Sequence, residues 1–181
     1  MAQHPNAPAH QSSLLEVGLS LGSNLGDRVA SLSHARRAIG AIDGVKVVSA
    51  SSLYETEPVG VKPEFQHMKF INAVLILKTR LPIAELHERL SEIEHELGRV
   101  RVEDKFAPRA LDIDVLYAGE LVSDQPQLTL PHPRWAKRRF VLQPLAEIRD
   151  DLVLPGTEQT VREILSVLPP GEDVKKNPAS W

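Results

Sequence analysis

The sequence predicts an α+β protein with a ferredoxin-like β-α-β-β-α-β core, in which helices pack on the faces of an antiparallel sheet. Two observations carry this prediction. Apolar and polar residues alternate in strand-like segments, and between these segments apolar residues recur every three or four positions, as in helices. The chain has 181 residues, which is long enough for one domain with a substantial core. We expect residues 14–181 to form that single domain.

The first half of the core begins with a strand over residues 16–21, where apolar side chains alternate with small ones. The Gly-Ser-Asn-Leu-Gly turn over residues 22–26 ends it. No Gly-Lys-Ser/Thr follows, so this turn is not a P-loop and is interpreted as structural. Asp27 then caps a helix with an apolar stripe. Residues 45–54, rich in β-branched and hydroxyl side chains, predict the second strand.

The second half of the core repeats this alternation of strand and helix. Residues 70–77 are apolar on both faces and predict a central strand. Pro82 suits the first turn of a helix, which Gly98 ends. Residues 99–110 have no period and predict a loop, whereas residues 111–117 alternate again and predict the fourth strand.

Beyond the core the patterns are shorter. Ala118 and Gly119 predict a turn into a hairpin that ends in a strand over residues 121–122. A short helix is predicted near residues 133–139. An amphipathic helix is predicted over residues 161–168.

Composition excludes several classes of protein. The net charge of −3 argues against a general binder of nucleic acid or membrane surfaces, and the absence of cysteine excludes disulfides and thiolate metal sites. Residues 1–13 are polar and contain proline, so we expect a disordered tail without a targeting signal. The longest aliphatic run, residues 73–77, is far shorter than a membrane span. We therefore expect a cytoplasmic protein. We also expect a monomer, although no pattern in the sequence reveals the quaternary state.

Asp112 and Asp114 are the sharpest chemical feature. At positions i and i+2 of a strand, both side chains leave the same face of the sheet. Adjacent carboxylates repel each other, and a divalent cation held by their oxygens would relieve that repulsion. The alternative is an acidic solvent face, which is the commoner meaning of this pattern when it occurs alone.

The preceding loop favours the cation-binding interpretation. Its four cationic side chains would bind phosphate oxygens around the same cation. They are Arg99, Arg101, Lys105 and Arg109. The alternative is a solvated loop with surface ion pairs to Glu103 and Asp104. His132 and Arg138 belong to a second cationic segment further along the chain. His132 would donate to a phosphate or a ribose; a histidine near prolines that only shapes a turn is the alternative.

Three further residues suggest a flat ligand. Aromatic residues make up only 4% of the chain, and Phe70 and Phe140 would sandwich a heterocycle if they faced each other; core packing is the alternative. Asn72 shares a strand face with Phe70, and its amide offers one donor end and one acceptor end to an amide-like ring edge. Glu94, on the helix before the cationic loop, would orient an arginine or bind a ribose. An exposed helical glutamate is its alternative.

Taken in order, these segments resemble one enzyme family. The matching stretches are LSLGSNLGDR (19–28), SSLYETEPVG (51–60), FINAV (70–74), ELGRVR (96–101), APRALDIDVL (107–116) and LPHPRWAKRRFVLQPLAEI (130–148). They span nearly the whole chain after the tail, and the combination of G-R-x-R, P-R-x-L-D-x-D and P-H-P is highly specific. The chain is similar to the 6-hydroxymethyl-7,8-dihydropterin pyrophosphokinases of folate biosynthesis.

The resemblance implies a reaction and a set of roles. Members of this family bind ATP and two Mg²⁺ ions, transfer the β,γ-pyrophosphoryl group to the pterin and release AMP, with long flexible loops at the active site. It implies Asp112 and Asp114 as metal ligands, and Arg99 and Arg109 as catalytic arginines. The implied nucleotide contacts are Glu94, Arg99, Arg101, Lys105, Arg109, His132 and Arg138. The implied pterin contacts are Thr56, Val59, Phe70, Asn72, Phe106 and Phe140.

The chain departs from the family pattern in three places. Its loop reads K-F-A-P-R where members often carry R-W-G-P-R, so Lys105 supplies a point charge in place of a guanidinium fork and Phe106 lacks an indole N–H. Glu57 stands where proline is common. The loop over residues 61–69 is also longer than in the shortest members. None of these departures removes a metal ligand, so they bear on kinetics and loop geometry rather than on the class of reaction.

Two other classes of function occur on the same fold. An RNA-binding module would show aromatic strands and a basic sheet face, but the inner strands here lack that pattern and the net charge is negative. A regulatory domain that only binds a small molecule would not need a carboxylate pair beside four cations. Formation of AMP from ATP separates all three.

Overall fold

The computed structural model describes residues 14–58, 62–97, 108–171 and 173–181. Its core is a six-stranded sheet in the order β5-β1-β4-β3-β8, and β2 also pairs with β4. The strands are β1 (Leu15–Ser23), β2 (Val45–Ala50), β3 (Leu53–Thr56), β4 (Phe70–Thr79), β5 (Asp112–Ala118) and β8 (Val174–Asn177). These pairings are all antiparallel. The tail expected over residues 1–13 lies outside the described residues.

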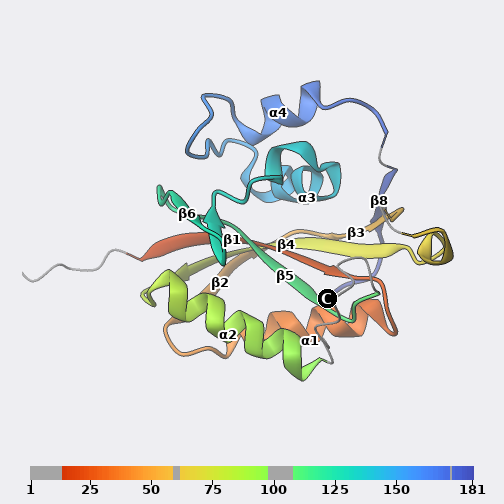
Figure 1. Ribbon diagram of the computed structural model, residues 1–181, viewed down its shortest axis with the longest axis horizontal. Coiled ribbons are helices and arrows are strands. Elements are labelled where there is room, and N and C mark those ends of the chain that lie inside the picture. Colours follow the sequence, from red (N-terminus) through yellow and green to blue (C-terminus); the bar gives the residue numbers. More distant parts are fainter. Residues whose placement is uncertain (1–13, 59–61, 98–107, 172) are drawn as a thin grey trace, which may run out of the picture.

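Helices cover both faces of this sheet (Figure 1). On one face lie α1 (Arg28–Gly40) and α2 (Ile83–Glu96), and on the other lie α3 (Arg139–Arg149) and α4 (Val161–Val167). The order from β1 to β5, with β1 and β4 side by side in the middle of the sheet, confirms the predicted ferredoxin-like core. No described helix combines the length and the apolar character that a membrane crossing requires.

The layer of α1 and α2 buries the larger core. Val17, Leu19 and Leu21 of β1 have no solvent exposure and pack in the same cluster as Leu32 and Ile39 of α1. This is the face that alternation along β1 and the helical stripe predict. The aspartate predicted to cap α1 does so, since its side chain accepts the Ala30 N–H at 3.0 Å.

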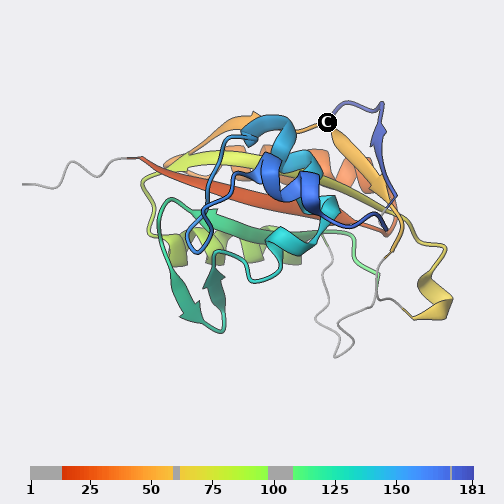
Figure 2. The same cartoon turned by 90° about the horizontal axis from the view of Figure 1, so that it is seen from above.

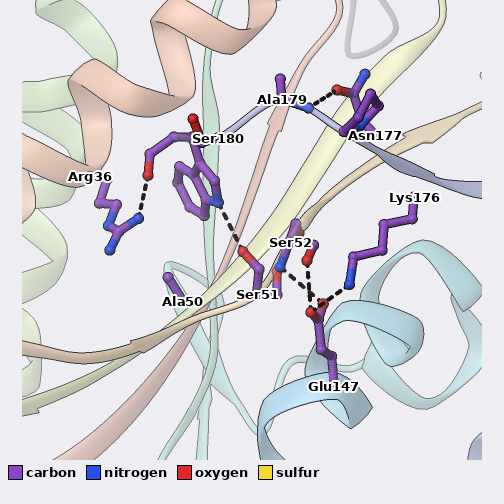
Figure 3. A pocket seen from close by; sticks show the side chains of 11 residues that line it. Arg36, Ala50, Ser51, Ser52, Glu147, Lys176, Asn177, Ala179 and Ser180 are labelled. Atoms are coloured by element: carbon purple, nitrogen blue, oxygen red, sulfur yellow. Dashed lines mark hydrogen bonds and ion pairs between the residues drawn. The ribbon is translucent and has the colours of Figure 1, made fainter.

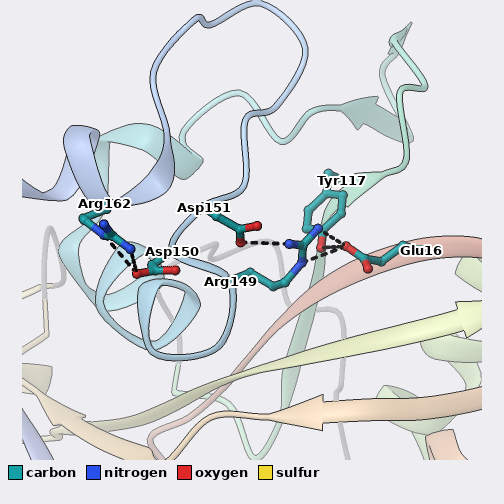
Figure 4. Close-up of polar contacts among 6 residues, drawn as sticks. All are labelled: Glu16, Tyr117, Arg149, Asp150, Asp151 and Arg162. Carbon is teal, nitrogen blue, oxygen red and sulfur yellow. Dashed lines mark hydrogen bonds and ion pairs between the residues drawn. The ribbon is translucent and has the colours of Figure 1, made fainter.

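A charged cluster holds α3 on the face of the sheet opposite α1 and α2 (Figure 4). One carboxylate oxygen of Glu16 accepts hydrogen bonds from the Tyr117 hydroxyl at 2.8 Å and from two nitrogens of Arg149 at 2.9 and 3.1 Å. Burial and the bond to Glu16 raise the pKa of Tyr117, which stays protonated as a donor. Gly18 makes room for the ring, because a Cβ at that position would lie 2.2 Å from a Tyr117 carbon.

The hairpin predicted after the fourth strand is wrong. Leu121 and Val122 are exposed, and the next residues form a separate hairpin, β6 (Ser123–Gln125) and β7 (Leu128–Leu130), which projects from the body (Figure 2). The Gly119 N–H donates to the Glu16 carbonyl at 2.8 Å. This bond holds the turn against β1, so the chain leaves the sheet instead of folding back along β5.

Residues 45–54 form two strands instead of the single strand predicted. The Ser51 hydroxyl accepts the Val74 N–H at 2.9 Å, which keeps the chain beside β4. Ser52 turns toward α3, where its N–H and hydroxyl donate to the Glu147 carboxylate at 2.9 and 2.7 Å. A carboxylate 95 residues away therefore interrupts the strand.

The C-terminal third differs most from the expectation. The short helix predicted near residues 133–139 is a 3₁₀ turn (Trp135–Lys137), and α3 follows it. Pro144 lies inside α3 and weakens its sequence signal, yet the helix forms because one face is buried on the sheet. The helix predicted over residues 161–168 is confirmed as α4. The edge strand β8 was not predicted.

Candidate functional site

Two of the predicted site residues, Asn72 and Asp112, lie in one row of the sheet, on the face covered by α3. Asn72 of β4 lies opposite Gly22 of β1, and Gly22 lies opposite Asp112 of β5. Opposite residues of an antiparallel pair point to the same face. Asn72 and Asp112 therefore flank the one position between them that has no side chain. A Cβ on Gly22 would lie 2.9 Å from Asn72 Oδ1, so only glycine leaves this floor open without displacing the amide.

Strand alternation separates the two aspartates from the core, as predicted. Ile113 and Val115 are buried in the cluster beneath the sheet, whereas the Asp112 and Asp114 side chains are 24% and 42% exposed. We call Asp112, Asp114 and the cationic side chains around them the acidic half of the site. Both carboxylates open onto solvent from the same face at the edge of the sheet.

Cationic side chains from three segments approach this pair. Arg109 Nη1 donates to Asp112 Oδ2 at 2.6 Å. His132 Nε2 and Arg138 Nη1 each lie 3.8 Å from Asp114 Oδ2. The sequence-distant residues 109, 132 and 138 are thus brought to one edge, as the cation-binding interpretation requires.

His132 is held as a neutral donor. Burial lowers the pKa of His132 below its usual 6.5, and the charges of Arg138 and Arg134 act in the same direction against the opposing effect of Asp114. Its Nδ1 accepts the Arg134 N–H at 3.1 Å. The remaining proton of the neutral ring is then on Nε2, the nitrogen that faces Asp114.

The donor set of the acidic half fits Mg²⁺. This ion prefers oxygen ligands, usually takes only one or two carboxylates from the protein, and completes its shell with water and substrate phosphates. Within the described ranges no group of three or more His, Asp or Glu side chains is placed to hold a metal. Asp112 and Asp114 would hold such a cation together with a phosphate ligand.

The neutral half of the site comprises Asn72, Thr56 and Phe70. Asn72 and Thr56 are each 4% exposed, and Asn72 Nδ2 donates to Thr56 Oγ1 at 2.8 Å. Phe70 pairs with Thr56 across β3 and β4, and its Cδ1 would lie 3.9 Å from a Cβ on Gly22. The bond to Thr56 fixes the orientation of the amide, so Oδ1 faces the open floor.

Phe140 lies in the first turn of α3 and is half-buried. The Arg138 guanidinium lies 5.4 Å from the centre of its ring. Phe140 therefore belongs to the α3 side of the site, next to a cation of the acidic half. Whether it sandwiches a ring with Phe70 stays a prediction.

Glu94 is not an exposed helical glutamate. Its side chain is 6% exposed, and Oε1 accepts the Ile113 N–H at 2.7 Å. It therefore holds the backbone between the two aspartates. The predicted contacts of Glu94 with an arginine or a ribose are not tested by this bond.

Asn24, in the turn after β1, was missed as a site residue. Its N–H donates to the Arg109 carbonyl at 3.0 Å, and its Oδ1 accepts the Arg109 N–H at 2.7 Å. The turn was interpreted as structural because it lacks a P-loop pattern. A signal was present, since an asparagine in a turn often bonds to backbone groups.

Part of the predicted site lies outside the described residues. These are Val59, Arg99, Arg101, Lys105 and Phe106.

An open pocket of about 610 Å³ lies away from this site, between α1, the connection from β2 to β3, and the C-terminal segment (Figure 3). Trp181 Nε1 donates to the Ser51 carbonyl at 2.8 Å, and the Arg36 guanidinium lies 5.3 Å from the centre of the Trp181 ring. Glu147 accepts from Ser52 in the same region. These contacts join elements of the fold, and none of the predicted site residues lines the pocket.

Comparison with known proteins gives three consistent matches. The model of the family described as 7,8-dihydro-6-hydroxymethylpterin-pyrophosphokinase (HPPK) matches residues 18–150. A 2-amino-4-hydroxy-6-hydroxymethyldihydropteridine pyrophosphokinase of Methylorubrum extorquens is 46% identical over 153 residues, 84% of this chain and 92% of that one. The Haemophilus influenzae protein of the same description is 37% identical over 165 residues, 91% of this chain and all of that one.

The solved structures agree on the fold. Wild-type HPPK-DHPS of Plasmodium falciparum superimposes with a TM-score of 0.67 at 14% identity, covering 87% of this chain. The present chain spans only 44% of that longer protein. At this identity the match is evidence of a common fold.

Proposed function

This chain belongs to the 7,8-dihydro-6-hydroxymethylpterin-pyrophosphokinase family, which transfers pyrophosphate to hydroxymethyldihydropterin in folate biosynthesis, and we propose that ATP is the donor. The hydroxymethyl oxygen attacks the β-phosphorus of ATP. The bond between that phosphorus and the oxygen of the α-phosphate breaks, AMP leaves, and the hydroxyl proton passes to solvent. Such a transfer needs little covalent help, so the protein must mainly align the reactants and balance their charge.

The observation that carries this proposal is the row Asn72–Gly22–Asp112. One end of the row offers carboxylates beside cations, and the other offers a fixed amide in a buried setting. The carboxylates and cations suit a triphosphate with its metal ion, and the fixed amide suits a flat ring with an amide-like edge. Gly22 leaves the floor between them open, so that the hydroxymethyl group and the β-phosphate would meet above it.

In the acidic half, Asp112 and Asp114 are the ligands we propose for Mg²⁺, with two ions in the complete site. The bound ion would neutralise phosphate charge and orient its oxygens. Arg109 and Arg138 would bind phosphate oxygens, and the Nε2–H of His132 would donate to one; their contacts with Asp112 and Asp114 support these roles. The family resemblance adds Arg99, Arg101 and Lys105 as nucleotide contacts.

In the neutral half, Asn72 Oδ1 would accept a hydrogen bond from the pterin edge while Nδ2 stays bonded to Thr56. Phe70 and Phe140 would pack on the two faces of the ring. The resemblance adds Val59 and Phe106 to this pocket. Enclosing the ring here would also keep water from the β-phosphorus, which limits hydrolysis of ATP.

The test is a product analysis. The protein is incubated with ATP, Mg²⁺ and 6-hydroxymethyl-7,8-dihydropterin, and phosphorus NMR follows the products. We expect AMP and pterin diphosphate in equal amounts, with none formed when the pterin is omitted. ADP or free phosphate as the main product would mean that a different phosphorus is attacked and would overturn the proposal.

A further inference from the structure

The turn after β1 makes two hydrogen bonds to the backbone of Arg109. The Asn24 N–H donates to the Arg109 carbonyl at 3.0 Å, and Asn24 Oδ1 accepts the Arg109 N–H at 2.7 Å. Asn24 is 4% exposed, so its end of each bond is shielded from competing water. The two bonds join residues that lie 85 positions apart in the sequence, and Asn24 makes one with its side chain and one with its backbone.

These two hydrogen bonds lie next to the acidic half of the site. Asp112, three residues after Arg109, accepts a hydrogen bond from the Arg109 guanidinium at 2.6 Å. On the far side of Asp112, buried Glu94 accepts the Ile113 N–H at 2.7 Å. Asn24 and Glu94 therefore hold the chain on both sides of one carboxylate, from the turn and from α2 respectively.

The two anchors constrain different things. Ile113 lies within β5, where pairing with β1 already fixes the backbone. Arg109 lies before β5 begins, so strand pairing does not hold it. The bonds to Asn24 therefore fix the position of the Arg109 backbone. That position determines which atoms the Arg109 guanidinium can reach.

We propose that Asn24 is a positioning residue for the pyrophosphoryl transfer, acting through the guanidinium of Arg109. This proposal rests on the role proposed above for Arg109 and Asp112. Loss of the Oδ1 acceptor would free the Arg109 N–H and let the guanidinium drift from Asp112 and from the phosphate it binds. The neutral half, whose side chains come from β3 and β4, would keep its affinity for the pterin.

The experiment is a double-mutant cycle on the full chain. Single-turnover formation of AMP is measured for wild type, Asn24→Ala, Arg109→Ala and the double variant. We expect Asn24→Ala to slow the reaction roughly 10- to 100-fold with Arg109 present, because misplacing a catalytic group by about 1 Å has effects of this size. In the Arg109→Ala background the same change should slow it less than about 3-fold.

Matched variants separate positioning from a general loss of structure. Asn24→Asp keeps an acceptor oxygen at the same place and should restore most of the rate. Leu25→Ala, in the adjacent exposed residue, should leave it unchanged. The KM for the pterin should stay within about 3-fold of wild type in Asn24→Ala. If thermal melting shows that Asn24→Ala does not fold, Asn24→Ser, whose hydroxyl is too short to reach Arg109, takes its place in the cycle.

The outcomes are distinct. Equal losses from Asn24→Ala in both Arg109 backgrounds, or no loss with Arg109 present, would overturn the positioning role. Wild-type rates in both Arg109→Ala and Asp112→Ala would instead show that the proposed site is wrong, whatever Asn24 does.

Discussion

The acidic and neutral halves of the site lie on one face of one sheet, yet they are held in place differently. In the acidic half, ion pairs join side chains that are partly open to solvent, such as Arg109 and Asp112. In the neutral half, one hydrogen bond joins Asn72 and Thr56, both almost wholly buried. Solvent-exposed ion pairs contribute little to stability, whereas a buried polar group left without its partner is costly.

This difference separates catalysis from binding. Changes in the acidic half should reduce turnover and leave the fold intact, because its side chains are not part of the core. Changes in the neutral half should reduce affinity for the pterin and leave the nucleotide affinity intact. Gly22, which both halves flank, is the position where one substitution tests their independence.

The largest effect is expected from Asp112→Asn. It removes a charged ligand from the proposed cation, whose charge stabilisation is worth several kcal/mol, so kcat for AMP formation should fall roughly 100- to 1,000-fold. The free energy of unfolding in urea should change by less than about 1 kcal/mol, because the ion pair with Arg109 is partly open to solvent and asparagine keeps an acceptor oxygen. Asp114→Asn should behave alike. Near-normal turnover in both variants at ordinary Mg²⁺ would exclude these residues as ligands.

Asn72→Ala should come next and should show the opposite selectivity. Leaving the pterin edge unpaired costs about 1–3 kcal/mol, which predicts a roughly 10- to 100-fold weaker Kd for the pterin in calorimetric titration. The Kd for an unhydrolysable ATP analogue should change less than about 3-fold. Asn177→Ala, in an asparagine of β8 that bonds Ala179, is the matched control and should change neither. Equal losses for both ligands would contradict the division of the site.

Gly22→Ala should have a smaller effect on the same ligand. The new methyl group would lie 2.9 Å from Asn72 Oδ1 and force the amide to move, so the pterin Kd should weaken roughly 5- to 10-fold. Gly40→Ala is the control, because the nearest atom to its Cβ is 3.8 Å away. Unchanged pterin binding in Gly22→Ala would mean that the floor of the row is not used.

The smallest effect is expected outside both halves, at Glu147. Burial opposes ionisation there, but hydrogen bonds from Ser52 and Lys176 outweigh it and lower the pKa of Glu147 below its usual 4.5. A lowered pKa stabilises the folded state above pH 4.5, and this stabilisation is lost as the pH falls through the lower value. Glu147→Gln should thus reduce the free energy of unfolding by about 1 kcal/mol at pH 7.

The same Glu147→Gln variant should differ less from wild type when unfolding is repeated at pH 3.5, roughly one unit below the ordinary carboxyl pKa. Its rate of AMP formation at pH 7 should match wild type. A stability difference that does not shrink with acid would show that the charge of Glu147 is not what joins α3 to Ser52.

How far the sequence predicts the fold depends on the layer. Val17, Leu32 and Ile39 all pack into one core cluster. The spacing of such residues along the chain therefore predicts the strand and the helix to which they belong. The α3 layer is less visible in the sequence. Its helix contains Pro144, and the break between β2 and β3 depends on a bond from Ser52 to Glu147 that no local pattern indicates.

The site divides in the same way. The shared face of Asp112 and Asp114 follows from strand period alone, and the structure places Asn72 in the same row through pairing with β1. The contact of Asn24 with Arg109 joins two loops distant in sequence, and a pattern of neighbours cannot show it. Likewise, Glu94 is recognisable as a polar helical residue, but its buried bond to Ile113 becomes visible only in the structure.

The most direct test of the divided site is a crystal structure of the protein with Mn²⁺ in place of Mg²⁺, an unhydrolysable ATP analogue and the pterin. Anomalous scattering from manganese locates the cation independently of any interpretation of the ligands. We predict a peak within coordination distance of the Asp112 and Asp114 carboxylates, with phosphate oxygens on the same ion and the pterin edge against Asn72. A manganese peak and a triphosphate bound elsewhere, with that carboxylate pair bare, would contradict the account.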